Sequence, residues 1–202
     1  MKTTFYLLAI ALFFSPQFLL AQEKEAPKWT LLGYGGIGYG IVENNNAPNY
    51  NLNSNNGSLL LNYGFSDKLG LATGIGLNEL TGNGFNANGN FYHERTLLQV
   101  PLIFTLNSEV AEGFSITGAM GLLAQNIVKD QFTFLNETQN DVYEGWNLGA
   151  QFSLGFLFTV LDDIKAGIHY QGQTDFGTFD SGNNEQKLSA LNSVGLIFMF
   201  GI

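Results

Sequence analysis

The sequence contains no cysteine, which excludes a disulfide framework and a lipid-carrying cysteine anchor. Charged residues make up only 12% of the chain, against roughly a quarter in typical soluble domains. After the first 21 residues there is no apolar run of the roughly eighteen or more residues that a membrane helix needs. Stability must therefore come from packing or from closing a sheet on itself.

The first 21 residues have the pattern of a secretory signal peptide. Lys2 gives a positive start, an apolar run follows, and Ala21 is a small residue for cleavage. A membrane anchor is the alternative, but Pro16 and Gln17 interrupt the run. We expect residues 22–28 to form a short periplasmic leader and residues 29–202 to form one domain.

Acidic residues outnumber basic ones by 17 to 8, which gives a formal net charge of -9. A chain of this charge repels nucleic acid and anionic lipid surfaces. No nucleic acid partner is therefore expected.

The segment Trp146–Phe158 alternates with a period of two, which indicates an extended strand. One face carries large apolar side chains, and the other carries Asn147, Gln151, Ser153 and glycines, with Leu157 as the exception. A tilted strand needs roughly nine to eleven residues to cross a bilayer. The segment is therefore predicted to be one strand of a membrane-spanning barrel.

Seven further segments alternate less cleanly and supply the other predicted strands: 29–41, 57–65, 69–78, 91–106, 113–126, 164–176 and 188–202. Short turns between them interleave with longer polar loops at 42–56, 79–90, 127–144 and 177–187. This is the pattern of an all-β, eight-stranded antiparallel up-and-down transmembrane β-barrel of the cell outer membrane, with both termini in the periplasm. Pro101 inside a strand predicts a bulge or a local break. A soluble lipocalin-like barrel is the alternative fold.

A barrel of eight strands has room inside only for side chains, and the inward parity here is mostly Gly, Ser, Asn, Gln and Thr. Arg95 and Asp175 both have inward parity at a similar height above the periplasmic end. A charge in a narrow lumen needs a partner, because its desolvation is costly. We expect these two residues to share one polar network near the loop end. The predicted network also includes three further inward residues, Gln99, His169 and Gln171.

Two motifs have functional interpretations that their context does not support. Gly33 to Gly38 matches the G-x-G-x-x-G pattern of dinucleotide sites, but no helix is predicted to follow it. His93 and His169 are the only histidines, and a lipid-modifying barrel enzyme would need one of them beside a serine and an acid. We interpret His93 as a rim residue and His169 as a lumen residue, and we expect no metal site.

Four segments combine aromatic residues, glycines and turn residues in strand–turn–strand patterns: YGFSDKLGLATGIG (63–76), RTLLQVPLIFTL (95–106), GFSITGAMGLL (113–123) and GLIFMF (195–200). These segments resemble the PorT-type outer-membrane β-barrel domain of Bacteroidota. It covers essentially residues 22–202 and uses aromatic, glycine and turn patterns rather than catalytic residues. It implies a location and a fold, and it implies no activity.

The sequence thus predicts a small outer-membrane barrel that is not an enzyme and holds no cofactor. Its expected role is structural, or is binding through extracellular loops that a rigid scaffold presents. A narrow small-solute channel and a lipid-A-modifying enzyme are the alternatives. The expected partners are outer-membrane lipid, the barrel-assembly machinery and an extracellular ligand of unknown identity, and the expected state is a monomer.

Overall fold

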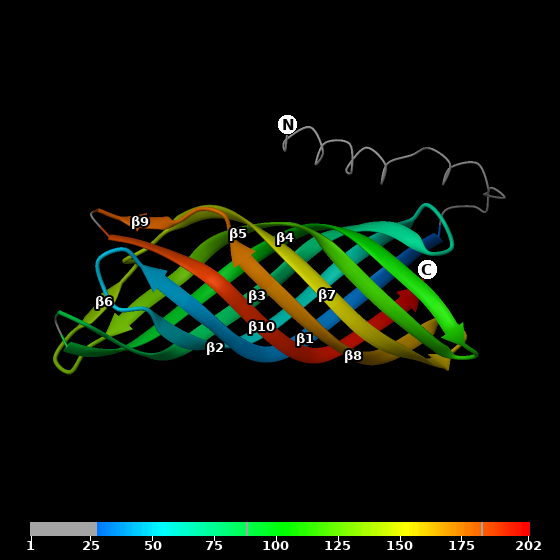
Figure 1. The fold of residues 1–202 in the computed structure, drawn as a ribbon, viewed down its shortest axis with the longest axis horizontal. Helices are drawn as coiled ribbons and strands as arrows, with labels where there is room; N and C mark the ends of the chain where they lie inside the picture. The colour runs from blue at the N-terminus through cyan, green and yellow to red at the C-terminus, as the bar shows by residue number, and fades with distance from the viewer. Residues whose placement is uncertain (1–27, 88, 183) are drawn as a thin grey trace, which may run out of the picture.

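The computed structural model describes residues 28–87, 89–182 and 184–202. Within this part of the chain, eight long antiparallel strands form a closed ring (Figure 1). They are β1 (Lys28–Asn44), β2 (Tyr50–Gly64), β3 (Leu69–Asn86), β4 (Gly89–Ala111), β5 (Phe114–Thr133), β7 (Gly145–Leu161), β8 (Ile164–Asp175) and β10 (Asn184–Gly201). The predicted barrel fold is confirmed. The predicted signal peptide 1–21 and residues 22–27 of the predicted leader lie outside the described residues.

The ring closes through β1, which pairs with β2 on one side and β10 on the other. Two short strands, β6 (Thr138–Asn140) and β9 (Phe179–Ser181), extend the sheet at one end by pairing with β5 and β10. The first described strand begins and the chain ends at the opposite end, where the Ile202 amide donates to the Trp29 carbonyl oxygen at 3.0 Å. Among the described residues no helix is long and apolar enough to cross a membrane.

The predicted loops 42–56, 79–90, 127–144 and 177–187 are largely strand in the structure, so their predicted extents are wrong. β2 begins at Tyr50, β3 continues to Asn86 and β5 continues to Thr133. Alternation persists in these extensions, because Leu52 and Ser54 are buried while Asn51 and Asn53 are exposed. The outward residues are polar there, so a search for apolar alternation ends the strands too early.

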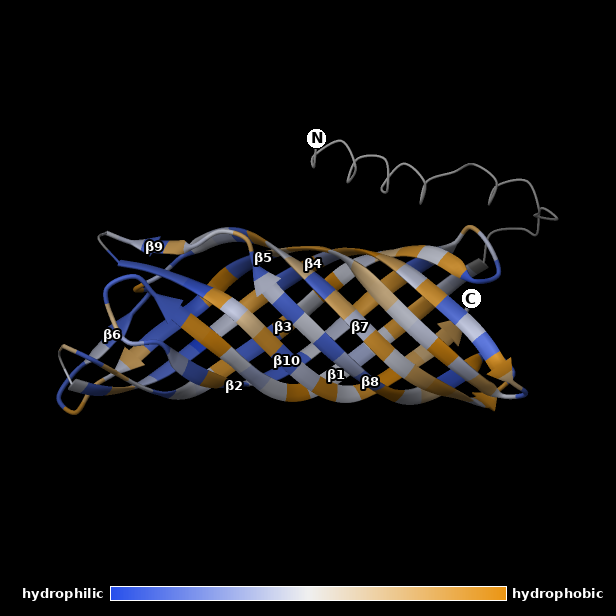
Figure 2. Ribbon diagram, in the orientation of Figure 1, coloured by the Kyte–Doolittle hydropathy of each residue, from blue (hydrophilic) through white to orange (hydrophobic). Residues whose placement is uncertain are grey.

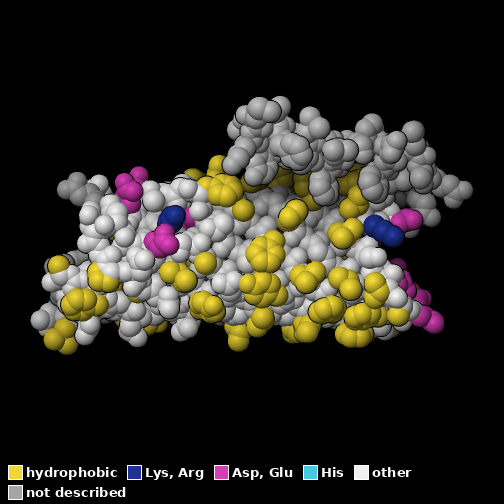
Figure 3. Space-filling view, in the orientation of Figure 1, with side chains coloured by type: hydrophobic (Ala, Val, Ile, Leu, Met, Phe, Trp, Pro, Cys, Tyr) yellow, Lys and Arg dark blue, Asp and Glu magenta, His cyan; other side chains and the backbone are white. Residues whose placement is uncertain are grey.

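The outer wall carries an apolar belt on the half of the barrel that contains the tight turns (Figure 2). Phe104, Met120 and Trp146 face outward with 62%, 65% and 62% of their surface exposed. A soluble barrel would not expose such residues around its wall, so the lipocalin-like alternative is contradicted. Trp29 packs edge-on against Tyr63 with ring centroids 5.0 Å apart at the turn end of the belt, where an aromatic girdle is expected. Figure 3 shows apolar side chains spread over the wall and acidic ones toward its ends.

Side chains fill the barrel interior in layers, and β4 contributes an inward residue to each layer. From the loop end they run through Phe91, His93, Arg95, Leu97 and Gln99 to Ile103. One apolar cluster surrounds Phe91 and Leu97, and a second surrounds Ile103 nearer the turns. The prediction of a mostly small, polar filling is therefore wrong in part. Its one noted exception, Leu157, faces inward and is fully buried.

The predicted disturbance at Pro101 is a local break without a bulge. The β3–β4 pairs stop at Thr73 with Leu102 and resume at Gly76 with Gln99 in the same register. Proline has no amide hydrogen to donate to the ladder. At this break the Thr73 hydroxyl donates a hydrogen bond to the Pro101 carbonyl oxygen at 2.8 Å.

The G-x-G-x-x-G segment lies inside β1 at the seam where the ring closes, and no helix follows it. An added methyl group at Gly195 of β10 would overlap the backbone carbonyl of Gly35, whereas one at Gly35 meets no atom within 4 Å. Glycine at position 195 thus allows the two seam strands to approach.

We predict that Gly195→Ala destabilises the barrel by about 1–3 kcal/mol, as overpacking usually does, and that Gly35→Ala is near neutral. Urea unfolding in lipid vesicles, with the gel mobility of unboiled samples as the folding check, measures both. Equal stability of the two variants would contradict the close approach at the seam.

Candidate functional site

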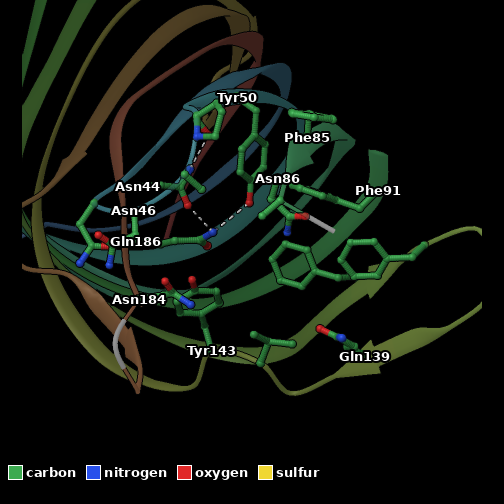
Figure 4. Close-up of a pocket in the computed structure, with 17 residues that line it drawn as sticks. Asn44, Asn46, Tyr50, Phe85, Asn86, Phe91, Gln139, Tyr143, Asn184 and Gln186 are labelled. Carbon is green, nitrogen blue, oxygen red and sulfur yellow. Dashed lines mark hydrogen bonds between the residues drawn. The ribbon is translucent and has the colours of Figure 1, made fainter. Parts of the chain in front are cut away.

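The loop end of the barrel holds a cavity of about 240 Å³ (Figure 4). Six aromatic residues contribute to its lining: Tyr50, Phe85, Phe91, Phe132, Phe134 and Tyr143. Seven carboxamide residues complete most of the rest: Asn44, Asn45, Asn46, Asn86, Gln139, Asn184 and Gln186. No charged side chain belongs to the lining among the described residues.

Asp130 is the centre of a buried cluster beside this cavity. Its Oδ1 accepts from Arg95 Nε at 2.7 Å and from His93 Nε2 at 2.8 Å. Its Oδ2 accepts from the backbone amide of Tyr143 at 3.1 Å, which ties the β5–β7 connection to the wall. Arg95 also donates from Nη2 to Gln186 at 2.8 Å. The guanidinium carbon of Arg95 lies 5.3 Å from the centre of the Tyr143 ring, within cation–π range.

The hydrogen bonds of the cluster continue from the ion pair to the cavity lining. Burial lowers the pKa of His93 to about 4, and the charge of Arg95 adds to this against the opposing hydrogen bond to Asp130. The ring is therefore neutral at neutral pH, with Nε2–H donating to Asp130 and Nδ1 accepting from the Tyr50 hydroxyl at 2.9 Å. Gln186 Nε2 in turn donates to the Tyr50 oxygen at 3.1 Å and to Asn44 Oδ1 at 2.7 Å.

Sequence reasoning missed Asp130 and Gln186 because both lie in segments predicted to be loops, 127–144 and 177–187, and because a β-bulge next to each of them reverses the strand parity. In β5 the register to β4 shifts after Ile127, so Val128 and Lys129 both face outward and Asp130 faces inward. In β10 the register to β1 shifts beside Ser189, which likewise turns Gln186 inward. Strict alternation would have placed Lys129 inside the barrel. The available signal was the apolar pattern resuming in the other parity at Phe132.

Asp175, Gln99 and Gln171, three residues of the predicted network, lie together in a glutamine layer below the cluster. Gln99 Nε2 donates to Gln125 at 3.2 Å and to Gln173 at 3.1 Å. Gln125 donates to Asp175, whose second oxygen accepts from the Leu188 amide at 2.9 Å. Gln171 and Gln173 both donate to Gln151 at 3.4 Å.

Arg95 and Asp175 both face the lumen, but no hydrogen bond joins them among the described residues. Arg95 pairs with Asp130 instead, so the structure divides the predicted residues between two adjacent clusters. His169 is apart from both. Its ring packs edge-on against Tyr34 with centroids 5.1 Å apart, and neither ring nitrogen has a hydrogen-bond partner in the described part of the chain.

The lumen below the glutamine layer is filled by side chains. The cavity beside Tyr34, Ser58 and Ile103 measures about 10 Å³, roughly the space of a single water molecule. Nowhere in the described residues do three or more His, Asp or Glu side chains gather in a way that could hold a metal ion.

The fold is similar to those of solved bacterial surface and outer-membrane proteins. The chain superposes on a major outer membrane protein from Thermus thermophilus with a TM-score of 0.59 and 11% identity, covering 88% of this chain and all of that one. It matches Neisserial surface protein A with a TM-score of 0.56 and 7% identity, covering 87% of this chain and 99% of that one. The chain is an eight-stranded outer-membrane β-barrel. No protein-family model and no curated protein matches the sequence, so the resemblance to the PorT-type domain stays a prediction.

We predict that Arg95→Ala and Asp130→Ala each lower the free energy of unfolding by about 3–5 kcal/mol, because each leaves a buried charge unpaired. The double variant should cost less than the sum of the two. Glu94 and Lys129 on the same two strands form an outward pair at 2.8 Å with much of each side chain in water, so their alanine variants should cost about 0–1 kcal/mol. Urea unfolding in vesicles followed by tryptophan fluorescence compares the two pairs. Similar costs for both would refute the role of the inner pair.

The His93 ring should half-titrate at about pH 4 rather than near its ordinary value of about 6.5. Because the folded pKa is the lower one, the stability that neutral His93 contributes is complete above the unfolded pKa and is lost as the pH falls through the folded pKa. The ring proton NMR signal, assigned with His93→Gln, measures this pKa. Half-titration above pH 6 would show that the ring is hydrated.

Proposed function

We propose that this outer-membrane barrel is a binding protein of the cell surface that neither conducts nor catalyses. The supporting observation is the layer of side chains beneath the loop-end cavity. Arg95, Asp130, His93 and Gln186 form a hydrogen-bonded layer there, so the cavity opens toward the loops while the lumen below it is filled. A cavity of this shape can hold a ligand but cannot pass it through.

The interior supports this role over that of a narrow channel. Below the cavity a solute would meet the glutamine layer, linked by hydrogen bonds from Gln99 to Gln125 and Gln173. It would then meet the second apolar cluster, in which Leu32, Leu60 and Ile103 are each at most 2% exposed. Opening a path would break both layers, and the closed ring of eight strands cannot widen to make room.

The geometry of His93 gives little support to the alternative of a lipid-modifying enzyme. An acid is present at 2.8 Å, but the other ring nitrogen contacts the Tyr50 hydroxyl, and Asp130 is shared with Arg95. Burial raises the pKa of the Tyr50 hydroxyl, which makes it a poorer nucleophile. His93 itself is fully buried, so its ring cannot reach a lipid in the outer leaflet.

We also infer that the protein acts as a monomer. The ring closes within one chain, and every long strand has a hydrogen-bonded neighbour on each side. No long edge is left among the described strands for a second chain to extend, so association would have to use side chains on the wall alone.

Planar lipid bilayers test the closed lumen. We expect the purified barrel to insert without producing conductance steps, while a large porin reconstituted in the same way produces them. Inserted protein is confirmed afterwards by recovery of the folded form from the membrane. Stable ohmic steps from the wild-type protein would overturn the proposed function in favour of a channel.

A further inference from the structure

We propose that the loop-end cavity binds a neutral, polyhydroxylated ring, that is, a monosaccharide unit or the terminal sugar of a glycan. The proposal rests on the binding function proposed above and names its ligand class.

The cavity has two chemically different sides (Figure 4). Asn44, Asn46, Asn184 and Gln186 line one side, and Phe85 and Phe91 line the other together with the carboxamides Asn86 and Gln139. A pyranose ring has the same division, with hydroxyl groups around its edge and C–H groups on its faces. A wholly apolar ligand would desolvate the carboxamides without replacing their hydrogen bonds, which is costly.

Carboxamides suit hydroxyl groups because each carries donors and an acceptor, and a hydroxyl is also both. The hydrogen-bonding groups of the cavity floor are held in place before any ligand arrives. Gln186 is fixed by Arg95, Asn44 and Tyr50, and Asn44 Nδ2 also donates to the Pro48 carbonyl at 2.9 Å. The Tyr50 oxygen accepts one hydrogen bond from Gln186, and a hydroxyl oxygen has two lone pairs, so it retains the capacity to accept another. Such preorganisation lowers the entropic cost of binding.

Charge selects neutral sugars over acidic ones. The lining contains no charged side chain among the described residues, and the buried Arg95 beneath it is compensated by Asp130. The chain as a whole carries a formal charge of -9, which disfavours the approach of anions. The volume of about 240 Å³ is below the roughly 300–1,000 Å³ of pockets for drug-sized ligands, which fits one sugar unit.

Saturation-transfer NMR on the full barrel, folded in phosphocholine nanodiscs free of glycoside detergents, tests the proposal. The neutral probes are the methyl glycosides of glucose, mannose and galactose. Three control compounds are compared with these glycosides. Glucuronic acid is a sugar that carries a negative charge, and cyclohexanol is a six-membered ring with a single hydroxyl group. N-acetyl-phenylalaninamide is a neutral aromatic amide. We expect at least one neutral glycoside to receive saturation, strongest on one face of its ring, and to be bound about tenfold more tightly than glucuronic acid or cyclohexanol.

Two phenylalanines at the loop end provide a matched pair of variants. Phe85 lines the cavity and Phe176 does not, yet their exposed fractions are similar at 57% and 62%. Phe85→Ala should weaken glycoside binding about tenfold through loss of a stacking face, and Phe176→Ala should change it less than twofold. Gel mobility of unboiled samples shows that both variants are folded.

Three results would overturn the ligand class: equal binding of cyclohexanol and the glycosides, equal effects of the two variants, or saturation of N-acetyl-phenylalaninamide alone. If the saturation of N-acetyl-phenylalaninamide is lost in Phe85→Ala, the cavity is a binding site for another ligand class and the proposed function stands. The proposed function itself fails through conductance in planar bilayers, which this experiment does not measure.

Discussion

Closure of the sheet is the constraint on which the rest of the structure depends. A strand in lipid must have all its backbone hydrogen bonds satisfied by other strands, and pairing of β1 with β10 removes the last open edge. Closure with eight strands also fixes a narrow interior. The inward residues therefore cannot line a wide pore and must pack against one another, which produces the stacked layers along β4.

Within that interior, the Arg95–Asp130 ion pair organises the loop end. Both side chains are almost fully buried, so each needs the other to offset its desolvation. Asp130 also accepts a hydrogen bond from His93, and Arg95 also donates one to Gln186. His93 and Gln186 in turn are both hydrogen-bonded to Tyr50 in the cavity lining. The charges thus lie beneath the cavity rather than in it. The cavity lining is therefore neutral, and the ion pair beneath it holds the lining residues in place.

The sequence predicted the strand number, the antiparallel order and the outward face, because alternation of large apolar residues reports directly on contact with lipid. It predicted the strand ends poorly, since Asn51 and Asn53 look like loop residues although they face water from a paired strand. It could not reveal the partners of Arg95. Asp130 and Gln186 reach the lumen only because one extra residue in each strand reverses the parity, and the only sequence signal of this is the change of apolar parity at Phe132. The cavity depends on several strands that meet only in the folded chain and was equally invisible.

The polar extensions of the strands above the apolar belt have a mechanical consequence. They continue the hydrogen-bonded wall of the barrel beyond the lipid, and the cavity lies at the end of these extensions. The part of the lining that the strands carry, such as Phe91 and Gln186, keeps its height when the connecting segments vary, whereas residues 45–48 and Tyr143 belong to those segments and complete the cavity. Because the cavity lies beyond the apolar belt, a ligand can reach it without entering the hydrocarbon layer.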